Sequence, residues 1–181
     1  RLVPFKGLGM LLDAAARLLR GGQAVEVTVV GSGPMAQAWQ EQAAALGIAP
    51  NVRFTGALPA PQVAAEMARC HVFCLPSVRE SGGAVLLEAM ACARPVIAVG
   101  FGGPAEIVDD EVGRLVAVHS PEQVTADLAR ALADVCRDPQ RWSRRGSAGR
   151  RRAERHYSWP AKVAGAGAIY DEVIPMEVRH V

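Results

Sequence analysis

Short runs of β-branched and other apolar residues alternate along this chain with longer segments in which apolar residues recur every three or four positions. The first long segment, Gly7 to Arg20, has leucine and alanine at helical spacing and stops at a glycine pair. The run that follows it, Val25 to Val30, is typical of a buried strand. Further strands are predicted at 51–55, 72–75, 95–99 and 113–118. Further helices are predicted at 35–46, 61–70, from 84 onward, 121–136, 139–156 and 159 to about 176.

This alternation predicts parallel strands, because a parallel crossover needs room for a helix. The nearly continuous apolar character of the strands indicates a sheet that is covered on both faces. We therefore expect an α/β fold, a doubly wound Rossmann-like parallel sheet with helices on both faces, as a single domain over residues 1–181 with C-terminal helices at 139–176. A ligand of such a fold binds beyond the carboxyl ends of the strands.

Composition supports one full hydrophobic core, since half of the 181 residues are apolar and the net charge is only +2. No run approaches the roughly 20 apolar residues of a membrane span. The segment Arg1 to Gly7 has neither an initiator methionine nor the apolar stretch of a signal peptide, so we expect a domain excised from a longer protein.

Four cysteines, at 70, 74, 92 and 136, lie among apolar neighbours without a C-x-x-C pair. A metal site at Cys70, His71 and Cys74 is one interpretation, but a strand sends His71 and Cys74 to opposite faces and no second ligand pair follows. Buried reduced thiols are the favoured interpretation, which indicates a cytoplasmic protein without a structural metal.

Seven arginines crowd one segment, at 141, 144, 145, 150, 151, 152 and 155. Such a segment suits a nucleic acid or an anionic membrane. The favoured alternative is a solvated helix face interrupted by Gly146 and Gly149. We therefore expect no nucleic-acid partner, while peripheral membrane association stays open.

Candidate chemistry gathers in RESGGAVLLEAM, residues 79–90, directly after a predicted strand. Its glycine pair lets a ligand approach the backbone, and the helix that starts near Ala84 offers free N–H groups to a phosphate. Glu88 lies one turn along that helix, where a carboxylate suits the hydroxyls of a ribose. Glu80, in the loop, is free to reach the other end of the ligand. The structural alternative pairs Glu88 with a lysine or arginine and leaves Glu80 as a surface charge.

Arg1 and Lys6 are a second candidate pair, in a loop that Pro4 stiffens. Two cations aimed at the same edge of the sheet would neutralise a diphosphate, whereas the simpler alternative is two solvated cations. The turn at residues 31–36 fits the dinucleotide pattern G-x-G-x-x-A. The acidic residue that this pattern requires is replaced by Thr55-Gly56, so a structural turn is favoured over NAD binding.

Together these segments resemble the carboxyl-terminal, donor-binding half of a GT-B glycosyltransferase, of the large retaining group 1 (family 4) type that uses nucleotide-sugar donors. The similarity spans nearly the whole chain, and its most specific parts are the E-x7-E spacing of Glu80 and Glu88 and the upstream RLVPFKG. The matching segments, in family order, are RLVPFKG, VVGSGP, NVRFTGAL, FCLPSVRESGGAVLLEAMACARPVIA, GGPAEIV, GRLV and YSW.

The resemblance implies a role for each candidate. Arg1 and Lys6 would hold the donor diphosphate, Glu80 would contact the transferred sugar near the reacting centre, and Glu88 would hold the ribose. Of these, Arg1, Lys6 and Glu80 are the implied catalytic residues. The other implied donor contacts are Gly82, Gly83, Ala84 and Val85 for sugar hydroxyls and phosphate, and Ala57 and Leu58 for the base.

The implied reaction is transfer of a hexose from a UDP- or GDP-sugar to a glycan or lipid acceptor, with retention at the anomeric carbon. The leaving diphosphate would take the proton, and with two cations and helix amides in place no cofactor or divalent metal is expected. The resemblance further suggests polysaccharide assembly, at the inner face of a membrane.

This chain departs from the family pattern in three respects. Gly82 stands where the family often has phenylalanine, which leaves sugar selectivity open, and Ala93 replaces a usual glycine. We expect the amino-terminal acceptor domain to lie outside this chain, and we therefore expect the isolated chain to be inactive. The last helix, from Trp159, resembles one that packs on that missing domain, and we expect its apolar face to be exposed or covered by a second copy in a homodimer.

Three other functions remain as alternatives. A non-catalytic nucleotide-sugar binding module would use the same residues without transferring anything. Half of a sugar-nucleotide epimerase fits the architecture, but the paired glutamates and the RxxxxK spacing fit transferases better. An NAD-dependent enzyme is disfavoured by Thr55-Gly56.

Overall fold

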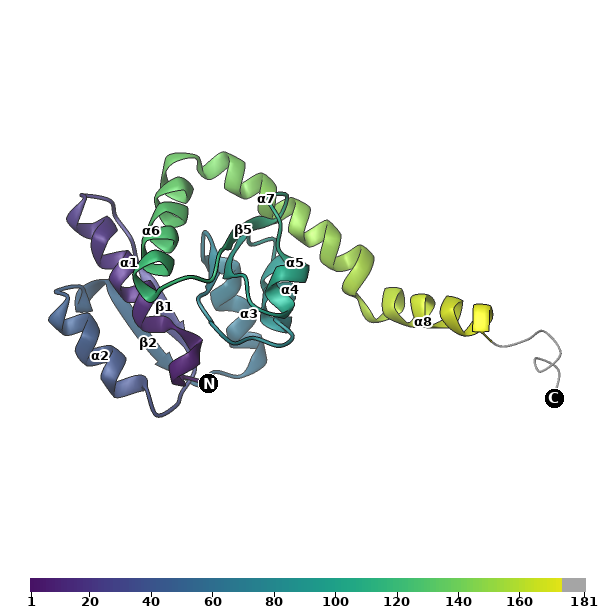
Figure 1. Ribbon diagram of the computed structural model, residues 1–181, viewed down its shortest axis with the longest axis horizontal. Helices are drawn as coiled ribbons and strands as arrows, with labels where there is room; N and C mark the ends of the chain where they lie inside the picture. Colours follow the sequence, from purple (N-terminus) through teal and green to yellow (C-terminus); the bar gives the residue numbers. More distant parts are fainter. Residues whose placement is uncertain (174–181) are drawn as a thin grey trace.

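The computed structural model describes residues 1–173 and consists of parallel strands flanked by helices (Figure 1). Its strands are β1 (Val27–Val30), β2 (Val52–Gly56), β3 (Phe73–Leu75), β4 (Val96–Val99) and β5 (Gly113–Val116). β1 pairs with β2 in one sheet, while β4 lies between β3 and β5 in the other, and all of these pairs are parallel. The predicted parallel α/β class is confirmed. The hydrogen bonding divides the strands into two sheets, where the sequence pattern suggests a single one.

The helices follow the predicted order, with one addition. In the described residues they are α1 (Leu8–Arg20), α2 (Ala36–Ala45), α3 (Ala60–Arg69), α4 (Ala84–Ala91), α5 (Gly103–Ile107), α6 (Pro121–Arg137), α7 (Pro139–Arg152) and α8 (Trp159–Val173). Short 3-10 turns at Pro4–Lys6 and Ala49–Asn51 precede α1 and β2, and a π-helical turn at Ala153–Tyr157 joins α7 to α8. The short helix α5 was not predicted, and the predicted helix end at 174–176 lies outside the described residues.

β4 is the strand with the most complete burial. Ile97 and Val99 face a core shared with α1 and α6, whereas Val96 and Ala98 face a second core shared with α4. All four side chains are fully buried, because successive residues of a strand point to opposite faces and helices cover both. The doubly covered sheet that the sequence predicts is therefore present around β4.

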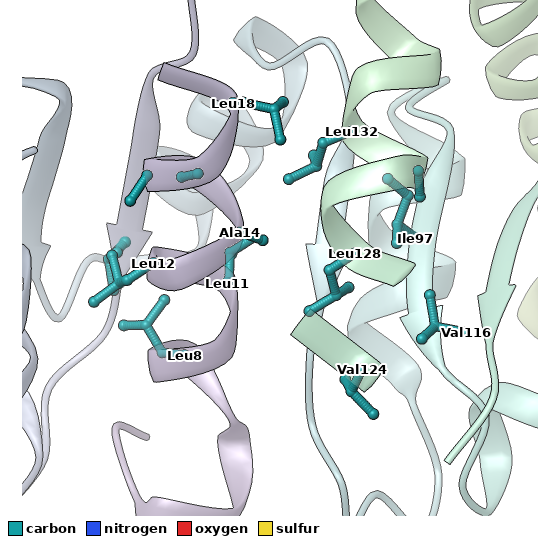
Figure 2. Packing of buried hydrophobic residues seen from close by; sticks show 14 of the residues in the cluster. Leu8, Leu11, Leu12, Ala14, Leu18, Ile97, Val116, Val124, Leu128 and Leu132 are labelled. Carbon is teal, nitrogen blue, oxygen red and sulfur yellow. The ribbon is translucent and has the colours of Figure 1, made fainter. Parts of the chain in front are cut away.

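Helices α1 and α6 pack against each other on one face of the strands. Figure 2 shows Leu11 and Leu18 of α1 opposite Leu128 and Leu132 of α6. These leucines recur at helical spacing and are buried, and each contributes about 1.5–3 kcal/mol by leaving water. The contact fixes the start of α1, and hence the segment that precedes it, at the carboxyl edge of the strands.

The arginine-rich segment is the polar side of a helix that packs on the domain. A Cβ added at Gly146 would overlap the Ala93 carbonyl oxygen, and one at Gly149 would meet Met90 Cγ at 3.1 Å, so the two glycines allow α7 to approach α4 closely.

Four of the guanidinium groups form ion pairs within the chain: Arg141 with Asp134 and Asp138, Arg145 with Asp110, Arg150 with Glu154, and Arg152 with Asp109 and Glu111. These contacts favour the helix-face interpretation, in which the glycines are packing positions rather than interruptions.

Helix α8 projects away from the rest of the domain (Figure 1). Its apolar side chains are exposed: Trp159 by 84%, Val163 by 66% and Ile169 by 62%. The exposed apolar face expected from the sequence is thus observed in the described residues. None of the helices described is long and apolar enough to cross a membrane.

Candidate functional site

The site is built where the first seven residues meet the loop between β3 and α4. Gly7 adopts a left-handed conformation (φ 65°), and a Cβ there would overlap the Pro76 carbonyl oxygen. The Val78 amide donates to the Phe5 carbonyl oxygen at 2.9 Å. A glycine at position 7 therefore allows the short turn before α1 to lie directly against the loop that carries Glu80.

Lys6 and Glu80 are in contact. The Lys6 Nζ lies 2.6 Å from Glu80 Oε2, and the two side chains are 30% and 16% exposed. Burial disfavours the charged form of Glu80, but hydrogen bonding and charge from Lys6, together with the amides of Gly83 and Gly82, outweigh it and lower the Glu80 pKa below its ordinary value of 4.5. The Glu80 carboxyl group is therefore ionised at neutral pH.

The loop after Glu80 turns sharply into α4. Gly83 is buried with φ 70° at the N-cap, a conformation that disfavours any side chain, and its amide lies 3.4 Å from Glu80 Oε1. No acidic residue occupies the first turn of α4, and no side chain caps it. Gly82 and Ala84 are exposed and Val85 is half-buried, so the start of the helix is open to a ligand.

Glu88 is exposed on α4, one turn beyond Ala84. Within residues 1–173 it enters no ion pair and no hydrogen bond of its side chain. The structural alternative, in which a lysine or arginine neutralises Glu88, has no support in this part of the chain. The carboxylate remains free for hydroxyl groups of a ligand.

Arg1 lies beside the turn that resembles a dinucleotide fingerprint. The neighbouring Leu2 donates its amide to the Ser32 carbonyl oxygen at 2.9 Å and accepts from the Met35 amide at 3.1 Å. A Cβ on Gly33 would overlap the Leu2 carbonyl oxygen. The glycines of this turn thus accommodate the chain's own backbone, and the Met35 amide is already used, which favours the structural interpretation over NAD binding. Arg1 itself is exposed and in no ion pair of the described residues.

A second glycine pair, Gly102-Gly103, packs against the backbone of the loop that carries Glu80, and sequence reasoning missed it. The Gly103 amide donates to the carbonyl oxygens of Glu80 at 3.2 Å and Ser81 at 3.1 Å. A Cβ on Gly102 would overlap the Glu80 carbonyl oxygen, and one on Gly103 would overlap that of Gly82. The available signal was a Gly-Gly step after the strand 95–99, at the same edge of the sheet as the E-x7-E loop.

Ala57 and Leu58 lie after β2, apart from the Lys6–Glu80 loop. Ala57 is exposed, whereas Leu58 helps to line a hollow of about 440 Å³ between β2 and α3. Arg53, Thr55 and Glu66 also line it, and none of its lining residues comes from the loop that carries Glu80. Their contact with a base stays a prediction.

The cysteine expectations are partly wrong. Burial raises the pKa of Cys74 to about 12 and also raises that of Cys70, which fits unreactive thiols. By solvent exposure, however, Cys70, Cys74 and Cys92 are only partly buried, and Cys136, near the end of α6, is exposed. Residues 1–173 contain no cluster of three His, Cys, Asp or Glu side chains able to hold a metal ion, so the alternative site at Cys70, His71 and Cys74 has no geometric support.

Comparison with known proteins identifies the family. The family model for glycosyl transferases group 1 matches residues 1–149. The chain belongs to this family. The resemblance inferred from the paired glutamates is thereby confirmed, and the fold is that of one Rossmann-like half of a GT-B glycosyltransferase.

Curated relatives align with this chain over more than nine tenths of its length. A GDP-mannose-dependent alpha-(1-6)-phosphatidylinositol monomannoside mannosyltransferase of Mycolicibacterium smegmatis is 36% identical over 172 residues, covering 91% of this chain and 44% of the relative. A D-inositol 3-phosphate glycosyltransferase of Segniliparus rotundus is 37% identical over 175 residues, covering 94% of this chain and 38% of the relative.

Solved structures show the same likeness. HepE of Anabaena, in complex with UDP-glucose, superposes with a TM-score of 0.80 at 26% identity, over 96% of this chain and 47% of HepE. Sucrose-phosphate synthase of Thermosynechococcus elongatus gives a TM-score of 0.79 at 28% identity, over 93% of this chain and 42% of that protein. The chain spans less than half the length of each of these proteins.

Proposed function

We propose that this chain binds the diphosphate sugar donor of a retaining glycosyltransferase, whose acceptor is held by a second domain. The observation that carries the proposal is the Lys6–Glu80 contact beside the open start of α4. It sets a cation, a carboxylate and unpaired helix amides at one edge of the strands, where ligands of such folds bind. Family membership supports the same assignment.

The donor diphosphate would bind to Lys6, Arg1 and the first amides of α4. A diphosphate carries at least two negative charges, and the cations and the positive end of the helix offset them. As the sugar–phosphate bond breaks, negative charge grows on the leaving group, so the same contacts become stronger in the transition state. This arrangement would need no divalent metal.

Glu80 would act on the sugar rather than on the phosphates. Its lowered pKa keeps it ionised, so it would be repelled by a diphosphate unless it accepts hydrogen bonds from sugar hydroxyls. In that position its charge also offsets the positive charge that develops at the anomeric carbon. Glu88, free in the described structure, would accept from the two ribose hydroxyls.

The acceptor hydroxyl would attack from the face that the diphosphate leaves, giving retention, and the departing phosphate oxygen would take its proton. The nucleotide is a UDP- or GDP-linked hexose: one relative is named as GDP-mannose-dependent, and HepE was solved with UDP-glucose. The acceptor would be a glycan or a lipid-linked inositol derivative, by analogy with the names of the relatives. The exposed apolar face of α8 would pack on the acceptor domain or on a second copy.

Calorimetric titration of this chain with UDP, GDP, ADP and NAD tests the donor proposal. We expect measurable binding of UDP or GDP, and at least tenfold weaker binding of NAD, because the turn at residues 31–36 is filled by Leu2. Glu88→Gln should weaken the preferred nucleotide by about 10-fold, since it loses the charge from two hydrogen bonds. Equal affinity of the wild type and Glu88→Gln would contradict the ribose contact, and no binding of any nucleotide would contradict the proposal.

A further inference from the structure

Two half-buried cysteines lie at the amino ends of neighbouring strands, on the opposite edge from the candidate donor site. Cys70 is the C-cap of α3, just before β3, and Cys92 is the C-cap of α4, just before β4. Phe73 pairs with Val96 in the parallel ladder, and its amide donates to the Pro95 carbonyl oxygen at 2.9 Å. Because the two strands are in parallel register, the ends of the two preceding helices meet at the same edge.

A single guanidinium group joins the backbones of these two cysteines. Arg94 donates from Nη1 to the Cys70 carbonyl oxygen and from Nε to the Cys92 carbonyl oxygen, each at 3.0 Å. Both nitrogen atoms are bonded to the same carbon, so the two carbonyl groups accept from adjacent positions of one planar group. The cysteines are therefore close neighbours in space, although they follow different helices.

Both thiols contact the carboxyl-terminal half of α3, which packs against α4 (Figure 1). Cys70 Sγ lies 3.1 Å from the Met67 carbonyl oxygen, and Cys92 Sγ lies 4.0 Å from the Ala64 carbonyl oxygen. Residues 64 and 67 are neighbours on the helix surface because they are three positions apart. Burial raises the pKa of Cys70, and a charge on Cys92 raises it further, as expected of two sulfur atoms that lie near each other.

The other two cysteines have different surroundings. Cys74 packs against the core shared with α1 and α6, and Cys136 is exposed near the end of α6. Cys70 and Cys92 are half-buried, so a small oxidant has access to them while the packing of α3 on α4 holds them in place. Proximity and access, the two conditions for an exchangeable pair of thiols, are thus met at this edge.

We propose that Cys70 and Cys92 form a dithiol site, which a low-molecular-weight disulfide oxidises to an intramolecular disulfide between the ends of α3 and α4. The Cys92 thiolate attacks one sulfur of the small disulfide, which forms a mixed disulfide and releases one small thiolate. The Cys70 thiol then gives its proton to solvent, and its thiolate attacks Cys92 Sγ and releases the second small thiolate. Two protein thiols are thereby oxidised, and one small disulfide is reduced to two thiols.

The order of the two steps follows from the surroundings of Cys70. Its raised pKa makes it the poorer nucleophile toward a molecule in solution. In the second step it reacts within the chain, where proximity replaces the encounter with a free reactant. This inference does not rest on the proposed donor chemistry, because it uses residues at the opposite edge of the strands.

The test uses the full chain with Cys136→Ser as the parent, because exposed Cys136 would form mixed disulfides of its own. The parent and its Cys70→Ser and Cys92→Ser derivatives are treated with oxidised glutathione at about pH 8.5, near the ordinary pKa of a thiol. Intact mass and disulfide-linked peptides are measured with time. We expect the parent to lose two hydrogen atoms without retaining glutathione, and to give one peptide pair linked through Cys70 and Cys92.

The serine derivatives separate the two steps. Cys70→Ser should retain one glutathione on Cys92, because no second thiol completes the exchange. Cys92→Ser should react at least about 10-fold more slowly, because only the thiol with the raised pKa remains at the site.

Thermal unfolding shows whether the native fold accommodates the bond. The oxidised parent should unfold at least about 5 °C above its reduced form, because the cross-link closes a loop in the unfolded chain, and a reductant should remove the difference. The proposal is overturned by glutathione on both cysteines of the parent without a cross-link, by a cross-link that forms only between chains or only in denaturant, or by an unfolding midpoint that oxidation does not raise. The parent alone decides these outcomes if a serine derivative does not fold.

Discussion

The Lys6 ammonium lies 2.6 Å from Oε2 of Glu80, although the two residues are 74 positions apart in the sequence. This partly exposed ion pair at the carboxyl edge of the strands contributes little to stability, at most about 1 kcal/mol. Their position suits a ligand that needs both charges. A sugar diphosphate is such a ligand, because its phosphates are stabilised by a cation and its sugar hydroxyls by a carboxylate acceptor.

Replacement of Lys6 by methionine should separate binding from folding. We expect the affinity for UDP or GDP to fall about 10- to 100-fold, which corresponds to the loss of one charge-assisted contact, with a change in unfolding free energy below about 1 kcal/mol. Calorimetry and thermal unfolding measure the two effects. Arg144→Met is the matched control, because Arg144 is exposed and in no ion pair of the described residues. Equal nucleotide affinity in both variants would contradict the role of Lys6.

The lowered pKa of Glu80 predicts a dependence of stability on acid pH. The folded-state value lies below the ordinary 4.5, so the contribution of the ion pair is complete above about pH 4.5 and disappears as the pH falls through the folded-state value. Glu80→Gln should therefore lower the free energy of unfolding by up to about 1 kcal/mol relative to wild type at pH 7, and the two proteins should be equally stable at about pH 2 to 3. Urea unfolding at the two pH values tests this, with Glu26→Gln, an exposed carboxylate, as the control. A wild-type advantage that persists at low pH would mean that Glu80 acts through packing.

Much of this site was predictable because its residues are close in sequence or belong to spaced motifs. Glu80, the glycine pair and Glu88 lie within one loop and one helical turn, so their proximity follows from local geometry. The approach of Lys6 to Glu80 was predicted only through the family resemblance. It depends on Gly7 meeting the Pro76 carbonyl, a contact between distant segments that no local pattern encodes.

Other features depend on tertiary contacts alone. The Gly102-Gly103 step is visible in the sequence, but its packing against the backbone of Glu80 and Gly82 is a contact between two separate loops that no local pattern predicts. The division into two sheets also escaped prediction, since apolar runs identify strands and not their neighbours. The glycines of α7 are typical of helix interruptions in the sequence, whereas in the structure Gly146 packs against the Ala93 backbone.

Gly103→Ala should destabilise the domain and loosen the Glu80 loop. The added Cβ would overlap the Gly82 carbonyl oxygen, and the backbone shift required costs about 2–4 kcal/mol, or roughly 4–16 °C in the unfolding midpoint. Gly82→Ala is the matched control, because a Cβ there meets nothing within 4 Å. Thermal unfolding of the two variants decides the point, and an unchanged midpoint for Gly103→Ala would show that the two loops are not held against each other.

Ala93→Gly should stabilise the domain. Ala93 has φ 57° just after α4, and its amide and that of Arg94 bond back to Met90 and Ala89, as in a Schellman cap. Glycine removes a backbone strain of about 1–2 kcal/mol from the folded state. Its greater conformational freedom in the unfolded state offsets part of this, so the net gain in stability is about 0.5–1 kcal/mol. The same change at Ala91, the last residue of the helix, relieves no such strain and should cost up to about 0.5–1 kcal/mol. Denaturant unfolding of both variants measures this difference in sign, and destabilisation by Ala93→Gly would rule out strain at this position.

Gly82 should set the room available to the transferred sugar. Unlike Gly83, it does not have a left-handed backbone, and its surroundings are open, so neither conformation nor crowding requires a glycine there. Gly82→Phe should leave the unfolding midpoint within about 2 °C of wild type and the affinity for UDP or GDP within about twofold, because the diphosphate contacts remain. Binding of the corresponding nucleotide sugar should weaken at least about fivefold, because the ring takes up space beside Glu80. Calorimetry with each nucleotide and its hexose conjugate separates the two effects. A parallel loss of both affinities would place Gly82 at the phosphates, and no loss of either would remove it from the site.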